Sequence, residues 1–367
     1  MRIHHLLNSF ETGGAEMLVA AMAPAQMRAG HEVVVHAMSG VGAISEALTR
    51  AGVPFRCHLA RHPLHRIRQV ARSLRRDFDR PDVMHCHNLA PLIVGGAAAR
   101  LARVPVSVVT RHHPAKDDQQ ERKFWRAAKI TSCARVIACS ELVRSSMAQH
   151  SFADLRKLTM IANGCGEPNC ESQGEPLGEK QGVRLITVGR LVWEKDYPTL
   201  INAFALARQA IPALELWIAG DGIERTRIES VIAAADLDAS VKLLGMKKNV
   251  GYYLQQCDIF VLSSVSEGLP VSQLEAMAAG LPMIVTDVGG MPDIINQSGA
   301  GMIVPKSNPA ALSEAILKMA GDPDALKTMG AKARATYQRD YTIERMCGDY
   351  ERLYRECLPL PAAARHR

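Results

Sequence analysis

The sequence lacks any run of about 18 consecutive apolar residues, the length that a membrane-spanning helix needs. Its longest apolar stretch, residues 89–99, ends at Arg100. The first residues lead into a strand-like segment without the long apolar stretch of a secretory signal, so we expect none. Low-complexity tracts and repeats of solenoid period are also missing. We therefore expect a globular protein that does not span a membrane.

The nine cysteines include no C-x-x-C pair, and their number is odd. This usage is unlike a disulfide framework or a zinc ribbon, and it predicts a reduced, cytoplasmic protein. Aromatic residues make up only 5% of the chain, and none interleave with its basic clusters. A nucleic-acid surface built on stacking is therefore disfavoured.

The net charge of +7 is uneven, because the excess of Lys and Arg lies in residues 1–170. Part of it falls on residues 62–78, where an apolar stripe at helical spacing predicts a helix that covers a sheet. The stripe consists of Leu64, Ile67, Ala71, Leu74 and Phe78, and the basic residues around it are Arg66, Arg68, Arg72, Arg75 and Arg76. A solvated basic face is one interpretation. Attraction to anionic lipid head groups, with the protein peripheral on the inner face of the membrane, is the other.

Short β-branched segments alternate with helix-length segments from end to end, which predicts parallel sheets built from βαβ units. Two such sets indicate an α/β protein of two doubly wound, Rossmann-like domains facing each other across a cleft. We expect an N-terminal domain over 1–165 and a second domain over 166–345, joined by a Gly-, Glu- and Pro-rich stretch. Residues 324–358 have a helical pattern, and a helix and tail over 346–367 would cross back to the first domain.

Open parallel sheets bind ligands at the carboxyl ends of their strands. Arg190 follows a strand in "VGRLVWEKD", and Lys195 stands just ahead of a helix expected near Tyr197. A planar guanidinium and a mobile ammonium at one strand end suit a diphosphate, although two ordinary surface cations would give the same pattern.

The segment "SEGLPVSQLEAM" follows another strand. Pro270 is expected at the first helical position, and Gly268 would let the backbone approach a ligand. Free N–H groups from Leu269 onward would then hold an anion. Glu267 and Glu275 carry the wrong charge for phosphate, so we expect them to accept hydrogen bonds from a hexose and a ribose. Glu275 as a solvated helix residue is the alternative.

Two further strand ends lie in the first half. Gly13 and Gly14 precede a helix expected to begin near Ala15, which again provides a helix N-terminus with permissive backbone. His112 and His113 end the strand "VVT", where one of them would reach a ligand or simply cap the loop.

Together, "ETGGAE", "TRHH", "SELVRSSM", "IANG", "VGRLVWEKD", "IAGDG" and "SEGLPVSQLEAMAAGLPMIVTDVGGMPDII" resemble a retaining glycosyltransferase of family 4 with the GT-B fold, over nearly the whole chain. The resemblance implies a hexosyltransferase that moves a sugar from a nucleotide-diphosphate donor to a glycan or lipid-linked acceptor. Polysaccharide or glycolipid synthesis of the cell envelope is the implied setting, with no cofactor and no required metal.

The resemblance also implies roles for the candidate residues. Arg190 and Lys195 would neutralise the departing diphosphate, Glu267 would contact the donor sugar, and Glu275 would bind the ribose. The turn at Gly13 and Gly14 would lie by the phosphates and acceptor, with Gly268, Leu269 and Pro270 as the second phosphate turn. A histidine would lie by the donor sugar. It falls on His112, although the neighbouring His113 leaves that assignment open.

Other patterns in the sequence indicate a metal or a dinucleotide less well. The D-x-D triplets at 77–79 and 236–238 precede strands, so they belong at the wrong edge for a metal. His85 and His87 share a strand face, but no further ligand pair is spaced to close a zinc site. The glycines of "GVGAIS", residues 40–45, follow the second expected strand, whereas a dinucleotide fingerprint follows the first.

Two alternatives of another class stay open. One is a sugar-nucleotide epimerase or hydrolase of the same fold, which would act with no acceptor present. The other is a non-catalytic nucleotide-sugar binding protein, which would not need two cations at the diphosphate. The sequence does not identify the base or sugar of the donor, the acceptor or the oligomeric state.

Overall fold

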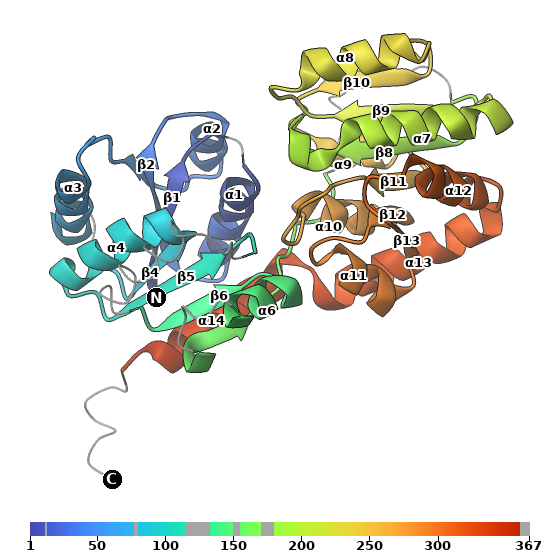
Figure 1. The fold of residues 1–367 in the computed structure, drawn as a ribbon. Coiled ribbons are helices and arrows are strands. Elements are labelled where there is room, and N and C mark those ends of the chain that lie inside the picture. The colour runs from blue at the N-terminus through green and yellow to red at the C-terminus, as the bar shows by residue number, and fades with distance from the viewer. Residues whose placement is uncertain (12, 77–79, 115–132, 150–154, 170–179, 360–367) are drawn as a thin grey trace. The chain divides into compact units, whose positions relative to one another are not determined.

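The computed structural model describes residues 1–11, 13–76, 80–114, 133–149, 155–169 and 180–359. The chain forms two compact units (Figure 1), one of Met1–Gly164 with Ile343–Arg367, the other of Cys165–Thr342. The sequence placed these limits at 165 and 345, so the structure moves the second one by a few residues. Among the described residues, no helix has the length and apolar character to cross a membrane.

The first unit contains a seven-stranded parallel sheet of order β3-β2-β1-β4-β5-β6-β7. Order reverses beside β1, so helices pack on both faces; α3 lies against α4, and α1 against α14. The strands are β1 (Arg2–Ser9), β2 (Glu32–Ser39), β3 (Phe55–Cys57), β4 (Val83–His87), β5 (Val106–Arg111), β6 (Arg135–Ala138) and β7 (Leu158–Met160). The helices are α1 (Gly14–Arg28), α2 (Ala43–Arg50), α3 (Pro63–Arg76), α4 (Leu89–Ala102), α6 (Glu141–Gln149) and α14 (Ile343–Cys357).

The second unit contains a six-stranded parallel sheet of order β10-β9-β8-β11-β12-β13. Its strands are β8 (Arg184–Val188), β9 (Glu215–Ala219), β10 (Val241–Gly245), β11 (Ile259–Leu262), β12 (Met283–Thr286) and β13 (Gly301–Val304). Its helices are α7 (Tyr197–Ala210), α8 (Arg225–Ala234), α9 (Val250–Leu254), α10 (Val271–Ala278), α11 (Met291–Ser298), α12 (Pro309–Ala320) and α13 (Pro323–Asp340), with a 3₁₀ turn η3 (Trp193–Lys195). Leu185, Leu216, Ile218 and Phe204 are fully buried in its core.

The predicted fold class is correct: each unit is a doubly wound parallel sheet covered by helices (Figure 1). The single helix expected over residues 324–358 is wrong in detail. Helix α13 ends at Asp340 and α14 begins at Ile343, with Thr342 between them in an isolated parallel bridge to Cys165. After this break α14 belongs to the first unit, where the buried side chains of Tyr350 and Tyr354 anchor it.

The basic segment forms α3, as expected, but its buried face is shifted. Leu64 is exposed, whereas Val70 is fully buried together with Leu74. A pattern of apolar spacing cannot tell which end of a stripe lies over the sheet, because that depends on where the helix docks. Phe78 lies outside the described residues.

Candidate functional site

Two loops at the carboxyl edge of the second sheet are tied to each other. One follows β8 and contains η3, and the other follows β11. The backbone N–H of Val265 donates to the carbonyl of Glu194 at 2.8 Å. The Ser263 hydroxyl donates to the carbonyl of Lys195, also at 2.8 Å. These bonds fix the backbone of Lys195 to the loop that carries Glu267.

Lys195 and Glu267 meet at this edge. The Lys195 Nζ lies 2.5 Å from Oε1 of Glu267, and the side chains are only 16% and 12% exposed. The Ser264 hydroxyl donates to the same Oε1 at 2.8 Å. Within the described residues, Oε2 of Glu267 accepts no such bond, so one carboxylate oxygen is committed to the protein and the other is left for a ligand.

Arg190 lies at the same edge, just after β8, and its side chain is exposed. Its neighbours hold its backbone, since the N–H of Leu191 donates to the carbonyl of Asp221 at 3.0 Å. Gly220 lets β8 and β9 end this closely, because a Cβ there would lie 1.8 Å from the Gly189 carbonyl. The cation is thus held on a rigid loop without a carboxylate neutralising it among the described residues.

The turn before α10 differs from the expectation by one position. The helix begins at Val271, and Pro270 is its N-cap, with extended dihedral angles and no side-chain cap. Gln273 is the first residue whose N–H bonds back into the turn, at 3.2 Å to the Pro270 carbonyl. Among the described residues, the N–H groups of Val271 and Ser272 donate to no carbonyl of the turn, and such donors at a helix N-terminus suit an anion.

The sequence interpretation missed the support behind this turn. Gly290 N–H donates to the Gly268 carbonyl at 2.6 Å. Gly289 has a φ of +66°, and a Cβ there would lie 2.7 Å from the carbonyl oxygen of Glu267. The Gly-Gly after β12 was the available signal, because a left-handed glycine at a strand end often marks such a close approach.

Glu275 lies on α10, one turn beyond the N-terminus, and its side chain is half-buried. Burial raises the pKa of its carboxyl to about 7. A fully solvated helix residue would be exposed, whereas Glu275 is half-buried, which favours a role for its carboxyl. With a pKa of about 7, the Glu275 carboxyl changes its charge near neutral pH, and its oxygens can accept hydrogen bonds.

In the first unit, Gly13 is the extended N-cap of α1, and the helix begins at Gly14. Gly14 is exposed, and a Cβ there would meet nothing within 4 Å. At Gly13, by contrast, a Cβ would lie 2.3 Å from the Glu16 carboxylate, so an acidic side chain of the same helix packs against the turn. The role of this turn in ligand binding stays a prediction.

His112 follows β5 directly and is buried, with 7% of its surface exposed. Its Nε2 lies 3.2 Å from Nδ1 of His87. Its backbone N–H donates to Oδ1 of Asn88 at 3.2 Å. Burial, assisted by the nearby His113 and Arg111, lowers the pKa of His112 to about 3, so the ring is neutral. His113 is exposed. The structure thus holds the His112 ring among buried partners, and which of the two histidines reaches a ligand stays open.

The other candidate patterns have structural explanations. Asp236 and Asp238 are exposed ahead of β10, at the opposite edge from Arg190. Residues 77–79 lie outside the described part of the chain. Gly42 packs against the carbonyl of Phe10, 2.8 Å from where its Cβ would be, so its loop serves packing. His85 and His87, with His5, are close enough to hold a metal ion, but they are bonded to each other and to neighbours, as described below.

Comparison with known proteins places both units. Residues 12–165 match the model for "Glycosyltransferase Family 4", and residues 171–336 match "Glycosyl transferases group 1". The chain is a GT-B glycosyltransferase of the family 4 type. A solved relative in fold is the Anabaena protein HepE in complex with UDP, at a TM-score of 0.84 and 20% identity, over 97% of this chain and 100% of that one.

Two curated relatives of this glycosyltransferase are informative. The chain is 32% identical to the amylovoran biosynthesis glycosyltransferase AmsK of Erwinia amylovora. The match covers only 44% of this chain and 42% of AmsK. The chain is 26% identical to the UDP-Gal:alpha-D-GlcNAc-diphosphoundecaprenol alpha-1,3-galactosyltransferase of Escherichia coli, over 74% and 75%. The chain thus spans less than half of the first relative and three quarters of the second.

Proposed function

We propose that the protein transfers a hexose, with retention of configuration, from a nucleoside diphosphate sugar to a glycan or lipid-linked acceptor in envelope polysaccharide or glycolipid synthesis. The observation that carries the proposal is the Lys195–Glu267 pair beside Arg190 and the open N-terminus of α10. Positive groups for a diphosphate and acceptors for sugar hydroxyls lie at one edge of one sheet. The bound UDP of the Anabaena protein and the UDP-galactose of the Escherichia coli relative make a UDP-sugar the first donor to test.

The mechanism follows from where charge develops. As the bond between anomeric carbon and phosphate oxygen breaks, negative charge grows on the diphosphate. Arg190, Lys195 and the N–H groups at the start of α10 would stabilise that charge in place. Glu267 holds the Lys195 ammonium in position through Oε1. Its Oε2 would accept from the donor sugar, and Glu275 would accept from the ribose.

Retention would follow from attack on the face that the diphosphate leaves. The acceptor hydroxyl would form the new bond to the anomeric carbon and give its proton to the departing phosphate oxygen, so no protein base is needed. Two protein cations at the diphosphate support independence from a metal, because they supply the positive charge that a divalent ion supplies elsewhere.

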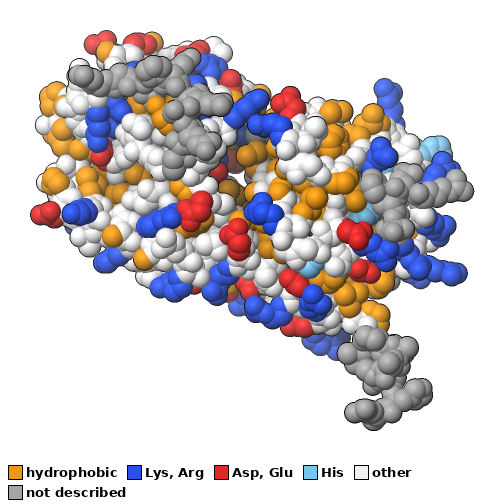
Figure 2. All heavy atoms as spheres, turned by 180° about the vertical axis from the view of Figure 1, so that it is seen from behind, with side chains coloured by type: hydrophobic (Ala, Val, Ile, Leu, Met, Phe, Trp, Pro, Cys, Tyr) orange, Lys and Arg blue, Asp and Glu red, His pale blue; other side chains and the backbone are white. Residues whose placement is uncertain are grey.

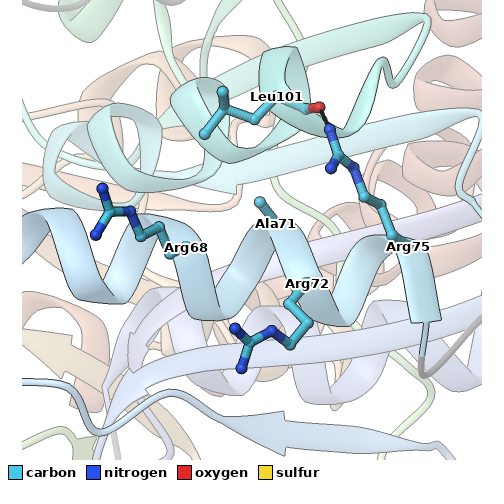
Figure 3. A pocket seen from close by; sticks show the side chains of 5 residues that line it. All are labelled: Arg68, Ala71, Arg72, Arg75 and Leu101. Carbon is cyan, nitrogen blue, oxygen red and sulfur yellow. Dashed lines mark hydrogen bonds between the residues drawn. The ribbon is translucent and has the colours of Figure 1, made fainter.

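A membrane-associated acceptor is supported by the basic face of α3. Arg68, Arg72 and Arg75 are exposed and line a hollow that Ala71 and Leu101 complete (Figure 3). Arg75 also hydrogen-bonds the carbonyl of Leu101 at the end of α4. On the face drawn in Figure 2, many basic side chains and fewer acidic ones lie along one side of the unit that carries the histidines. Such a surface would hold the protein peripherally on anionic lipid.

A donor screen tests the function. Thermal shifts are measured with UDP-, GDP- and ADP-sugars, and products are then identified by mass spectrometry with and without EDTA. We expect a thermal shift that depends on the nucleotide and transfer that survives EDTA. Proton NMR of the product should show that the anomeric configuration is that of the donor. Release of free sugar with no acceptor-dependent product would instead support a hydrolase, and binding without turnover would support a non-catalytic protein.

A further inference from the structure

A line of buried hydrogen bonds runs from α1 to the end of β5 in the first unit. Gln26 Oε1 lies 2.8 Å from Nε2 of His5. Nδ1 of His5 lies 3.1 Å from Nε2 of His87, and Nδ1 of His87 lies 3.2 Å from Nε2 of His112. We call Gln26, His5, His87 and His112 the histidine chain. All four are buried.

The protons of this chain are not independent of one another. Burial lowers the pKa of His5 to about 4, of His112 to about 3, and of His87 well below its ordinary value, so each ring is neutral and carries one N–H. An amide oxygen only accepts, so the proton of His5 is on Nε2. Nδ1 of His5 must then accept from His87 Nε2, and Nδ1 of His87 must accept from His112 Nε2.

Tyr354 of α14 starts a second line of buried hydrogen bonds. Tyr354 is fully buried, and burial raises the pKa of its phenol well above the ordinary value. The Tyr354 hydroxyl lies 2.6 Å from Nδ1 of His85. Nε2 of His85 lies 2.8 Å from Oγ1 of Thr110. This second line lies beside the histidine chain, since the ring centres of His85 and His87 are 4.2 Å apart.

We propose that Gln26, acting through His5 and His87, is a positioning residue that fixes the proton of His112 on Nε2 and leaves Nδ1 as a hydrogen-bond acceptor. An unprotonated Nδ1 accepts a hydrogen bond from a saccharide hydroxyl, whereas the other tautomer would donate one. The catalytic part of this inference rests on the proposed contact between His112 and the donor sugar. The assignment of the proton does not.

The same histidines raise the question of a metal ion. Ligand atoms of His5, His85 and His87 all lie within 4.8 Å of one another. Every ring nitrogen of these residues nevertheless has a hydrogen-bond partner already. A cation would displace the shared protons and leave Gln26, Thr110 or Tyr354 without its partner, so the hydrogen-bonded network is the better account.

Nitrogen NMR tests the inference directly. In the full-length protein labelled with ¹⁵N-histidine, two-bond correlations separate the protonated nitrogen of each ring from the unprotonated one. The His112 signals are assigned by their loss in His112→Asn. At pH 7 we expect protonated Nε2 and unprotonated Nδ1 on His112. Protonation of Nδ1, or a stoichiometric metal ion in the purified protein, would overturn the proposal.

Variants then test the role of Gln26. Gln26→Met keeps the length but removes the amide, and we expect His112 to show both tautomers. Gln26→Glu keeps an acceptor toward His5 and should restore the single tautomer. Gln69→Met, on the exposed face of α3 in the same unit, is the control and should change nothing. An unchanged His112 pattern in Gln26→Met refutes the role.

Kinetics connects the proton to the sugar. We expect Gln26→Met to lower kcat/KM about five- to tenfold with the intact donor, as loss of one hydrogen bond does. A deoxy donor that lacks the hydroxyl contacted by His112 should show no such difference between variant and wild type, and a series of deoxy sugars locates it. Equal losses with every deoxy donor would indicate a merely structural effect. Failure of the wild type to transfer sugar would refute the proposed function, while the NMR result still decides the proton position.

Discussion

The ammonium of Lys195 lies 2.5 Å from Oε1 of Glu267, between two loops that follow different strands of the second sheet. The residues are far apart in the sequence, and parallel strands bring their carboxyl ends to one edge. The pair is mostly shielded from water, so each charge depends on the other for its stability there. Glu267 and Lys195 therefore form one structural unit, because the carboxylate holds the ammonium in place.

Lys195→Ala is expected to depress kcat about 10²- to 10³-fold, the typical effect of removing one group that stabilises developing charge. Donor binding, measured by calorimetry, should weaken much less. Lys327→Ala, an exposed lysine of α13 in the same unit, serves as control and should retain full turnover. Equal, small effects of both substitutions would contradict the role of Lys195.

Glu275 should make nucleotide affinity depend on pH. A ribose hydroxyl donates best to the ionised carboxylate, and the pKa of Glu275 is about 7. We therefore expect the affinity for the matching nucleoside diphosphate, measured by calorimetry, to rise between pH 6 and pH 8. Glu275→Gln should weaken binding and flatten this dependence. A variant that keeps the pH dependence of the wild type would exclude Glu275 as its source.

The same carboxyl should affect stability with the opposite trend. Its folded pKa of about 7 lies above the ordinary value of 4.5, so the folded state binds the proton more tightly than the unfolded state. The free energy of unfolding should therefore fall as pH rises from about 4.5 through 7, by at most about 3 kcal/mol. Glu275→Gln should remove this fall, which urea denaturation at several pH values would reveal.

Gly289→Ala should damage the turn that carries Glu267, because the new Cβ would lie 2.7 Å from the Glu267 carbonyl in a left-handed backbone. Gly299→Ala is a matched control with a similar φ of +62° and no contact to the turn. Both should lose about 1 kcal/mol of stability from backbone strain, and Gly289→Ala should lose more because its Cβ also meets backbone atoms of the turn. Only Gly289→Ala should also lose donor affinity in a binding titration.

Tyr354→Phe tests how α14 is held on the first unit. The substitution removes the hydroxyl 2.6 Å from Nδ1 of buried His85. An unpaired buried polar group costs about 1–3 kcal/mol, and we expect that loss in the free energy of unfolding. Tyr252→Phe, at a half-buried tyrosine of α9, is the comparison and should change stability little. Indistinguishable variants would show that the bond contributes nothing.

Vesicle binding tests the basic surface of α3. Replacing Arg68 and Arg72 with Gln should weaken sedimentation with anionic vesicles at low salt by about 1 kcal/mol per arginine. The control variant, Arg225→Gln with Arg227→Gln on α8, has the same net charge as the α3 variant. It should bind like the wild type. Efficient glycosylation of a soluble acceptor, together with no vesicle binding by the wild type, would contradict the membrane role.

Local pattern was sufficient for much of the architecture. The β-branched segments predicted parallel strands because strands buried on both faces need near-continuous apolar residues. The rule that ligands bind at strand ends then selected Arg190, Lys195 and Glu267, whose loops the structure does bring to one edge. Pro270 was misplaced by one position, since helix ends depend on backbone geometry that sequence fixes only approximately.

The sequence by itself determined which segments form strands and helices and which residue types stand at their ends, because periodicity and turn chemistry act over a few neighbouring residues. Only the tertiary structure decided that Glu267 is bonded to Lys195, that Gly289 supports their turn, and that Gln26 reaches His112 through His5 and His87. These relations join residues distant in sequence. They arise from strand order and the docking of α1 and α14, and no local pattern contains that information.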